Sequence, residues 1–250
     1  MHRKRPILLI GPMASESDWL ISQLDDPKTV KIGSYPYTEG TIDGYPVVVC
    51  RCYIGVVNSA TAAALGIQRF DPLCVILQGT SGAHDPDLHQ GDVVLGERTV
   101  NVGRWFTPHR DRGKGSDFFA WEPHGSELPS TSPDELLYFY GDEHILELAS
   151  GISNPIGKVV RGTIGAADIW NRELDVLEHL HRTLGTSCEE MEGYGVAQVC
   201  ARMGVPNADI RIISNSEWHP EEEFNENYGE DCQKFVLEVT RRLIAEKPQI

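Results

Sequence analysis

The stretch Cys74-Val75-Ile76-Leu77-Gln78-Gly79-Thr80-Ser81-Gly82-Ala83 joins a continuous apolar run to a tail of small residues. An apolar run of this length is typical of a strand that is buried on both faces. The sequence predicts further strands within residues 6–10, 45–50, 92–96, 159–165 and 210–215. Buried strands of this kind indicate a sheet that is covered by helices on both sides.

Helical patterns alternate with these strands. Residues 58–66 are mostly small and predict a closely packed helix, which Asp71-Pro72 ends. Further helices are predicted from residue 19 and over residues 134–150, 173–184, 191–203 and 235–245. The order predicts a single α/β domain over residues 1–250, with a mixed or mostly parallel sheet and ligands outside the carboxyl ends of its strands.

Composition narrows the range of partners. The chain has 22 Lys and Arg against 37 Asp and Glu, a net charge of −15, which opposes binding to nucleic acid. The apolar runs are much shorter than the roughly 20 residues of a membrane span, and no signal peptide is evident. Six scattered cysteines favour a reducing, cytoplasmic setting, and Cys50-x-Cys52 lacks the second cluster that a metal site requires. The sequence therefore predicts a cytoplasmic protein that binds neither nucleic acid nor membranes, without a metal ion.

The segment of residues 107–133 has a different texture. It is rich in Gly, Pro, His and charged residues, and the aromatic residues Trp105, Phe106, Phe118, Phe119 and Trp121 lie in or beside it. No clear period runs through it. Long irregular loops in compact domains are usually lids, binding loops or subunit contacts, and these alternatives remain open here.

Three sequence motifs lie at intervals that suggest a common site. They are Ile10-Gly11-Pro12-Met13 with Glu16, then Gly79-Thr80-Ser81-Gly82-Ala83, then Glu190-Met191-Glu192 with the later Arg211-Ile212-Ile213-Ser214-Asn215. Together they resemble the nucleoside phosphorylase superfamily over most of residues 7–243, least over residues 100–156. Within it the chain is most similar to the nucleosidases that hydrolyse methylthioadenosine and adenosylhomocysteine.

The resemblance implies a three-layer α/β/α sandwich with a central mixed sheet, and cleavage of an N-glycosidic bond without a cofactor. Glu192 matches the carboxylate that accepts hydrogen bonds from sugar hydroxyls and stabilises a developing positive charge. Glu16 matches the general base that activates water, with Asp18 as an alternative if the alignment shifts. By the same correspondence, base and sugar contacts are expected from Met13, Ile54, Ser81, Gly82, Ile169, Trp170, Met191, Arg211, Ser214 and Phe224.

Asn215 departs from the pattern. The adenine-cleaving nucleosidases that resemble this chain carry an aspartate there, which donates a proton to N7 of the base. An amide can instead accept from a protonated N7 and donate to an exocyclic oxygen, as in 6-oxopurine phosphorylases and futalosine hydrolases. The substitution favours a hypoxanthine-like base, or a binding protein that has lost turnover.

The nucleophile is expected to be water rather than phosphate. Hexameric phosphorylases that resemble this chain hold phosphate with arginines, whereas Leu77 precedes Gln78-Gly79 here and residues 11–19 contain no Lys or Arg. The sequence therefore predicts a purine nucleosidase that forms a homo-oligomer, a dimer or hexamer. An arginine from a neighbouring subunit would favour a phosphorylase, and a nucleoside-binding or storage protein is the third alternative.

Overall fold

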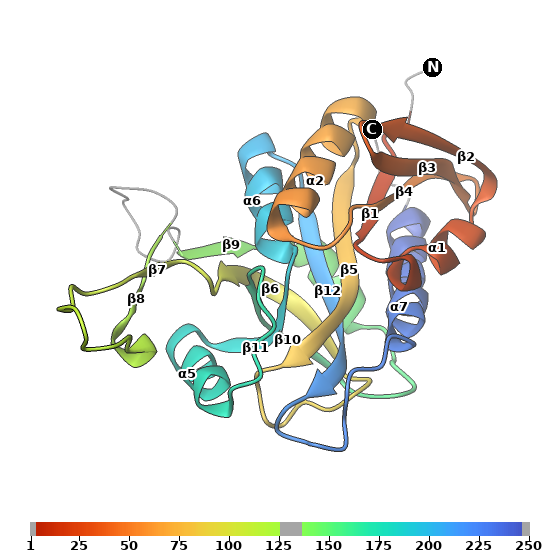
Figure 1. Ribbon diagram of the computed structural model, residues 1–250. Coiled ribbons are helices and arrows are strands. Elements are labelled where there is room, and N and C mark those ends of the chain that lie inside the picture. Colours follow the sequence, from red (N-terminus) through yellow and green to blue (C-terminus); the bar gives the residue numbers. More distant parts are fainter. Residues whose placement is uncertain (1–3, 126–136, 247–250) are drawn as a thin grey trace.

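The protein is a mixed sheet between two layers of helices. The computed structural model describes residues 4–125 and 137–246. Within them one sheet of ten strands has the order β11-β10-β6-β12-β5-β1-β4-β3-β2, with β9 beside β6 (Figure 1). The strands of this sheet are β1 (Ile7–Gly11), β2 (Asp25–Ile32), β3 (Tyr35–Ile42), β4 (Tyr45–Arg51), β5 (Cys74–Ala83), β6 (Val93–Asn101), β9 (Tyr138–Tyr140), β10 (Val159–Ala166), β11 (Thr186–Glu190) and β12 (Asn207–Ser216).

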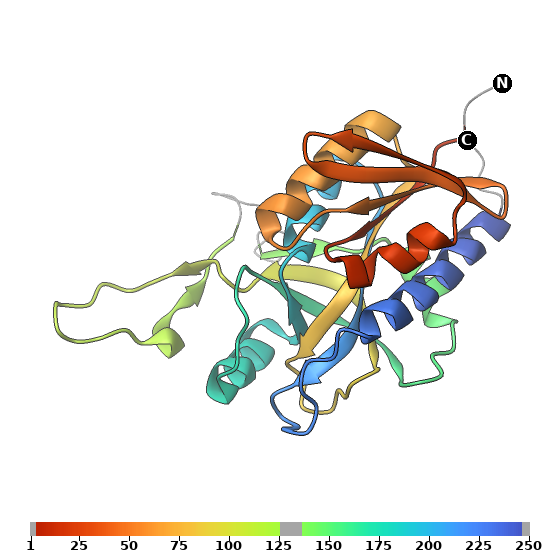
Figure 2. The same ribbon diagram turned by 45° about the vertical axis from the view of Figure 1, so that its right-hand side comes forward.

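The helices cover the two faces as the sequence predicts. Helices α2 (Val56–Phe70) and α6 (Gly193–Met203) pack together on one face, and α5 (Leu174–Leu184) lies against β11 (Figure 1). On the other face α7 (Tyr228–Ala245) packs against β5 and β12, beside α1 (Asp18–Ser22) and α4 (Glu143–Ser150) (Figure 2). None of the helices in the described residues is both long and apolar enough to cross a membrane.

Alternate side chains of the apolar strands supply two separate cores. Leu9 of β1 and Ile76 of β5 belong to the core beneath α7, whereas Leu8 and Val75 belong to the core beneath α2 and α6. Because successive side chains of a strand point to opposite faces, a continuous apolar run is needed to bury both. The unbroken runs in the sequence are explained by these two cores.

Several elements differ from the sequence prediction. The helix expected over residues 134–150 is wrong in its first half, because β9 lies at Tyr138–Tyr140 and α4 begins only at Glu143; residues 134–136 lie outside the described residues. Strands β2 and β3 were not predicted, because β2 is mostly polar and exposed and β3 is half-buried without a continuous apolar run. Strand β11 was not predicted either, since Thr-Ser-Cys-Glu-Glu has no apolar run.

The aromatic segment after β6 forms an arm that projects from the body (Figure 2). Its described part contains β7 (Trp105–Phe106) and β8 (Glu122–Pro123), which pair with each other, and the short 3-10 helix η2 (Phe118–Ala120). Trp105, Phe118 and His179 pack together where the arm meets α5. Residues 126–136, part of the predicted loop, lie outside the described residues.

Helix α7 fixes the loop after β1 through one buried glutamine. The Gln233 side-chain oxygen accepts from Leu20 N (2.9 Å), and its nitrogen donates to Ser15 O (2.7 Å) and Gly229 O (3.0 Å). Ser15 lies within the 3-10 helix η1 (Ala14–Glu16), and Leu20 lies within α1. Gln233 therefore ties η1 and α1 to the helical layer.

We expect Gln233→Leu to lower the free energy of unfolding by about 1–3 kcal/mol, because it leaves buried backbone groups without partners. Urea denaturation with an unchanged m-value would measure this loss. Gln68→Leu on the exposed face of α2 is the control. Equal stability of the two variants would contradict the assigned role of Gln233.

Candidate active site

One pocket opens at the carboxyl ends of the central strands. It gathers every residue that the sequence predicted for the site, from seven separate segments of the chain. These residues are Met13, Glu16, Ile54, Ser81, Gly82, Ile169, Trp170, Met191, Glu192, Arg211, Ser214, Asn215 and Phe224. Pro12, Thr80, Glu189 and Glu190 complete the lining. The fold thus places the predicted residues together, while their individual roles stay predictions.

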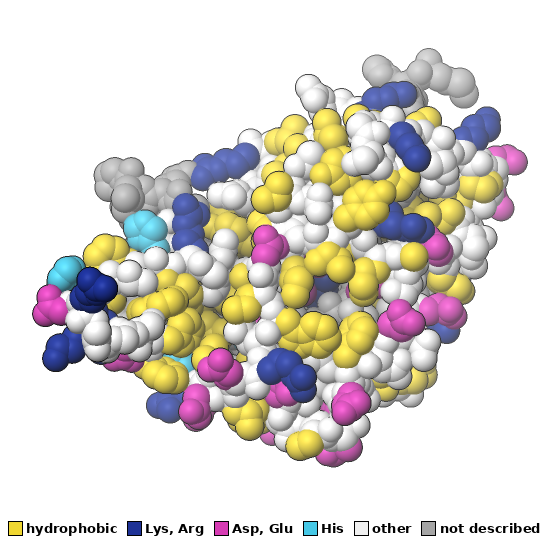
Figure 3. Space-filling view, viewed as in Figure 1, with side chains coloured by type: hydrophobic (Ala, Val, Ile, Leu, Met, Phe, Trp, Pro, Cys, Tyr) yellow, Lys and Arg dark blue, Asp and Glu magenta, His cyan; other side chains and the backbone are white. Residues whose placement is uncertain are grey.

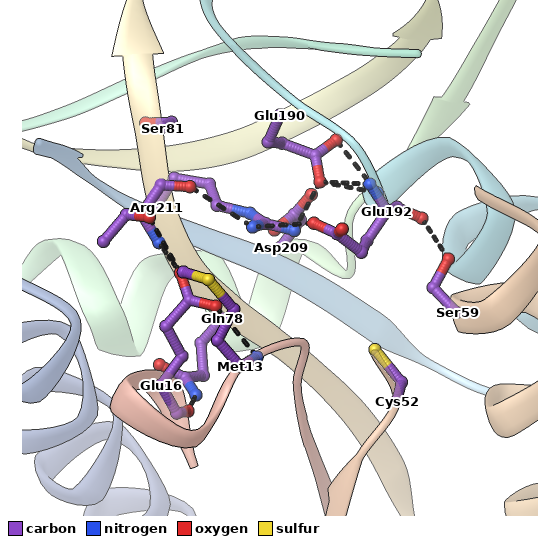
Figure 4. Close-up of polar contacts among 12 residues, drawn as sticks. Met13, Glu16, Cys52, Ser59, Gln78, Ser81, Glu190, Glu192, Asp209 and Arg211 are labelled. Carbon is purple, nitrogen blue, oxygen red and sulfur yellow. Dashed lines mark hydrogen bonds and ion pairs between the residues drawn. The ribbon is translucent and has the colours of Figure 1, made fainter. Parts of the chain in front are cut away.

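Glu16 lies at the bottom of the pocket with its carboxylate fixed. One oxygen accepts from the backbone N–H of Thr80 (2.7 Å) and from the Thr80 hydroxyl (2.8 Å), and the other accepts from Met13 N (3.2 Å). The Gln78 amide donates to the Glu16 carbonyl oxygen (Figure 4). The side chain is 1% exposed, and burial raises its pKa above the ordinary value, against the lowering effects of the Thr80 backbone and Arg211. A partly desolvated carboxylate of this kind suits a general base.

Asp18, the alternative base, lies outside this arrangement. Its carboxylate is exposed and pairs with Arg51, and it does not line the pocket. Glu16 is therefore the carboxylate of η1 and α1 that reaches the site.

Arg211 of β12 is the central cation of the site (Figure 4). Its guanidinium donates to Asp209 (2.7 Å) and to Glu190 (2.5 Å), and lies 3.4 Å from a Glu192 oxygen. The arginine is 1% exposed. Of this group, only Glu192 and Arg211 were predicted as site residues; Glu190 was part of a motif but was given no role. Asp209 carries no motif signal, because it is buried in a strand where a polar residue is unexpected.

Glu192 is held between the first turns of two helices. One carboxylate oxygen accepts from Gly55 N (3.0 Å) just before α2, and the Glu192 carbonyl oxygen accepts from the Ser59 hydroxyl (2.9 Å). The Glu190 carboxylate accepts from the backbone N–H groups of Glu192 (2.7 Å) and Gly193 (2.8 Å), which begin α6. Anions are favoured at helix starts, where N–H groups lack helical partners.

The group holds more acidic side chains than it can neutralise. Glu16, Glu190, Glu192 and Asp209 surround a single guanidinium, that of Arg211. Burial raises the pKa of Asp209, and it raises the pKa of Glu190 well above its ordinary value. The positive charge of Arg211 opposes both shifts. A site with this excess of acidic groups can stabilise a positive charge that develops on a ligand, and it repels anions.

Asn215 lies across the sheet from Gly82. The two residues pair in the β12–β5 register, and a Cβ at Gly82 would lie 3.1 Å from the Asn215 amide nitrogen. The Ser214 hydroxyl lies 3.0 Å from the Asn215 oxygen and 3.2 Å from the Ser81 carbonyl oxygen. Asn215 therefore presents an amide beside a position without a side chain.

The mouth of the pocket is apolar. Ile54, Ile169, Trp170 and Phe224 are each between 43% and 52% exposed, and the Trp170 and Phe224 rings meet edge to face at 5.5 Å. Figure 3 shows hydrophobic side chains gathered around a hollow near the middle of this face. An apolar mouth above a charged floor suits a flat base and a polar sugar.

Within the described residues, no group of three or more His, Cys, Asp and Glu side chains has the arrangement of a metal site. Cys50 and Cys52 are buried, and burial raises their thiol pKa values. The described part of the aromatic arm contributes no residue to the pocket.

Comparison with known proteins gives one consistent family. A family model described as the phosphorylase superfamily matches residues 6–245. The 5'-methylthioadenosine/S-adenosylhomocysteine nucleosidase of Bacillus subtilis strain 168 is 29% identical over 246 residues, which cover 95% of this chain and 99% of that protein. The nucleosidase of the same name from Halalkalibacterium halodurans is 28% identical over 241 residues, covering 94% and 97%.

Solved structures share the fold. The 5'-methylthioadenosine/S-adenosylhomocysteine nucleosidase of Neisseria meningitidis in complex with methylthio-immucillin-A has a TM-score of 0.79 at 24% identity, covering 96% of this chain and 100% of that one. The futalosine hydrolase of Helicobacter pylori strain 26695 has a TM-score of 0.79 at 22% identity, covering 95% and 98%. The three-layer α/β/α class with a central mixed sheet is therefore confirmed.

We expect Arg211→Met to destabilise the protein in a pH-dependent manner. At pH 8 it leaves buried carboxylates without their cation, a loss of about 3–5 kcal/mol in the free energy of unfolding. At pH 5 the loss is smaller, because the raised pKa values of Glu190 and Asp209 let these groups take up protons instead.

Urea denaturation of wild type and variant at both pH values measures the difference. Arg172→Met, which breaks only the exposed pair with Glu217, is the control and changes stability little at either pH. The same loss at pH 5 and pH 8 would show that charge is not its cause.

Proposed function

Because this chain belongs to the phosphorylase superfamily, we propose that it is an enzyme of the nucleosidase type, which hydrolyses the N-glycosidic bond of a purine nucleoside. The observation that carries the proposal is the Glu16 carboxylate, which takes the Thr80 N–H and hydroxyl as hydrogen-bond donors at the bottom of the pocket. The curated relatives from Bacillus subtilis and Halalkalibacterium halodurans are named nucleosidases, which supports this reaction class.

Water is favoured over phosphate as the nucleophile. A phosphate bound beside Thr80 would compete with Glu16 for its donors. Arg211 is the only Lys or Arg among the described residues that line the pocket, and it already forms ion pairs with three carboxylates. A phosphate there would meet repulsion without the charge-assisted hydrogen bonds that it requires.

The proposed reaction assigns one task to each carboxylate. Glu16 takes a proton from water, whose oxygen forms a bond to the anomeric carbon of the ribose. The bond from that carbon to the base nitrogen breaks, and its electron pair leaves with the base, which takes up a proton. Glu192 accepts hydrogen bonds from the ribose hydroxyls and stabilises the positive charge that develops on the sugar. Met191 packs against the ribose.

Asn215 favours a 6-oxopurine as the leaving base. Its amide oxygen accepts a hydrogen bond from a protonated N7, while its nitrogen donates to the exocyclic oxygen of the base. Adenine presents an amino group at that position, so the amide nitrogen and the base would both be donors. Trp170 covers one face of the purine. A cytoplasmic location and a homo-oligomeric state stay predictions from the sequence.

We expect Glu16→Gln to lower kcat by about 100- to 10,000-fold, the usual contribution of a general base. The test measures base released from inosine, guanosine, adenosine, methylthioadenosine and adenosylhomocysteine, with and without phosphate. We also expect the wild-type rate to fall as the pH drops through the raised pKa of Glu16, since protonation removes the base.

Asp18→Asn is the matched control for Glu16→Gln, because Asp18 lies two residues further along the chain and outside the pocket. The activity of this variant should match that of wild type. Release that depends on phosphate would make the protein a phosphorylase. Release of base from none of the five nucleosides, together with their binding, would favour a nucleoside-binding protein.

We expect Asn215→Asp to change the preferred base. The carboxyl group can donate a proton to N7, so cleavage of adenine nucleosides should rise by about tenfold or more relative to inosine. The kcat/KM ratio of methylthioadenosine or adenosine to inosine, in variant and wild type, measures the change. An unchanged ratio would remove Asn215 as the determinant of the base.

A further inference from the structure

The apolar wall at Ile169 and Trp170 belongs to a short segment whose two ends are fixed by hydrogen bonds. At its start, an Asp168 carboxylate oxygen accepts from Val56 N (2.8 Å) at the beginning of α2. At its end, Asn171 is bound by the buried Glu189. Ile169 and Trp170 themselves are about half exposed, so burial in the core does not orient them.

The contact between Asn171 and Glu189 is bidentate. The backbone N–H of Asn171 donates to one Glu189 oxygen (2.7 Å), and its side-chain nitrogen donates to the other (2.6 Å). Glu189 lines the pocket and is 6% exposed. Two hydrogen bonds to the two oxygens of one carboxyl group define the position of Asn171 more strictly than a single bond does.

Glu189 also has neighbours on β5 and at His84. It pairs with Gly82 in the β11–β5 register, opposite the side on which Asn215 pairs with Gly82. The His84 Nε2 atom lies 3.0 Å from a Glu189 oxygen, within ion-pair distance but outside hydrogen-bond angles. The other ring nitrogen of His84 hydrogen-bonds to the Thr186 hydroxyl at 2.7 Å, and both residues are fully buried.

We propose that Glu189 is a positioning residue, which holds the segment of residues 168–171 so that Ile169 and Trp170 face the base. It acts through Asn171 and forms no bond with the reacting atoms. The wall contacts the base alike in the ground state and the transition state. Loosening it therefore raises KM and leaves kcat nearly unchanged. This inference rests on the proposed function.

Asn171→Asp tests the contact by placing a second carboxylate against Glu189. At pH 8 the repulsion between the two carboxylates breaks the contact between residues 171 and 189. KM for the best wild-type substrate should then rise by about 10- to 100-fold, and kcat should stay within about threefold of wild type. The double variant Asn171→Asp with Glu189→Gln restores an amide and a carboxylate with exchanged roles. It should return KM to within about threefold of wild type.

Glu217→Gln is the matched control. It breaks the ion pair of Arg172, which is the residue next to Asn171, and leaves the contact between Asn171 and Glu189 intact. Its KM should equal that of wild type. The proposal would be overturned by an unchanged KM in Asn171→Asp, by a loss of kcat at constant KM, or by a double variant no better than the single one. A purely structural role for Glu189 would not give this split between KM and kcat.

A substrate-free measurement separates this inference from the proposed function. Acrylamide quenching of Trp170 fluorescence, taken as the difference from matched proteins carrying Trp170→Phe, should increase in Asn171→Asp and return to the wild-type value in the double variant. If wild type releases no base but this pattern holds, the nucleosidase proposal fails and the positioning contact stands. If wild type is active and quenching does not change, the positioning role fails.

Discussion

The buried pairing of Arg211 with Asp209, Glu190 and Glu192 is the interaction on which the rest of the site depends. A buried guanidinium is strongly destabilising without counter-charges, and buried carboxylates are equally costly without a cation. The charges are tolerated because β11 and β12 both pair with the end of β5, which brings their carboxylates and the guanidinium together. The same pairing places Glu192 in the lining of the pocket, so one set of contacts both neutralises buried charge and shapes the site.

Glycines let these charged groups approach one another. A Cβ at Gly79 would lie 2.8 Å from a Glu16 oxygen and 2.9 Å from the Arg211 guanidinium. A Cβ at Gly193 would lie 2.1 Å from an Asp209 oxygen. The Gly-Thr-Ser-Gly motif lies within β5. The absence of a side chain at Gly79 leaves room beside the strand for Glu16 and Arg211.

The charge of the pocket agrees with a neutral substrate and a cationic sugar in the transition state. Acidic groups exceed basic ones both in the whole chain and in the lining of the pocket. The net charge of the protein and the charge of the pocket therefore both disfavour an anionic ligand. The apolar mouth adds contact area for a base without adding charge. This combination suits a neutral, flat ligand.

The sequence by itself determined the buried strands and the two-sided core, and it predicted the residues of the site. Unbroken apolar runs such as residues 74–77 have one stable environment, a sheet covered on both faces, and short motifs indicated Glu16, Glu192 and Asn215. Only the tertiary structure decided the course of β11, which pairs with β10 and with the end of β5. Polar residues such as Glu189 and Asp209 carry no local signal of burial, because their partners lie far away along the chain and become neighbours only when the sheet forms.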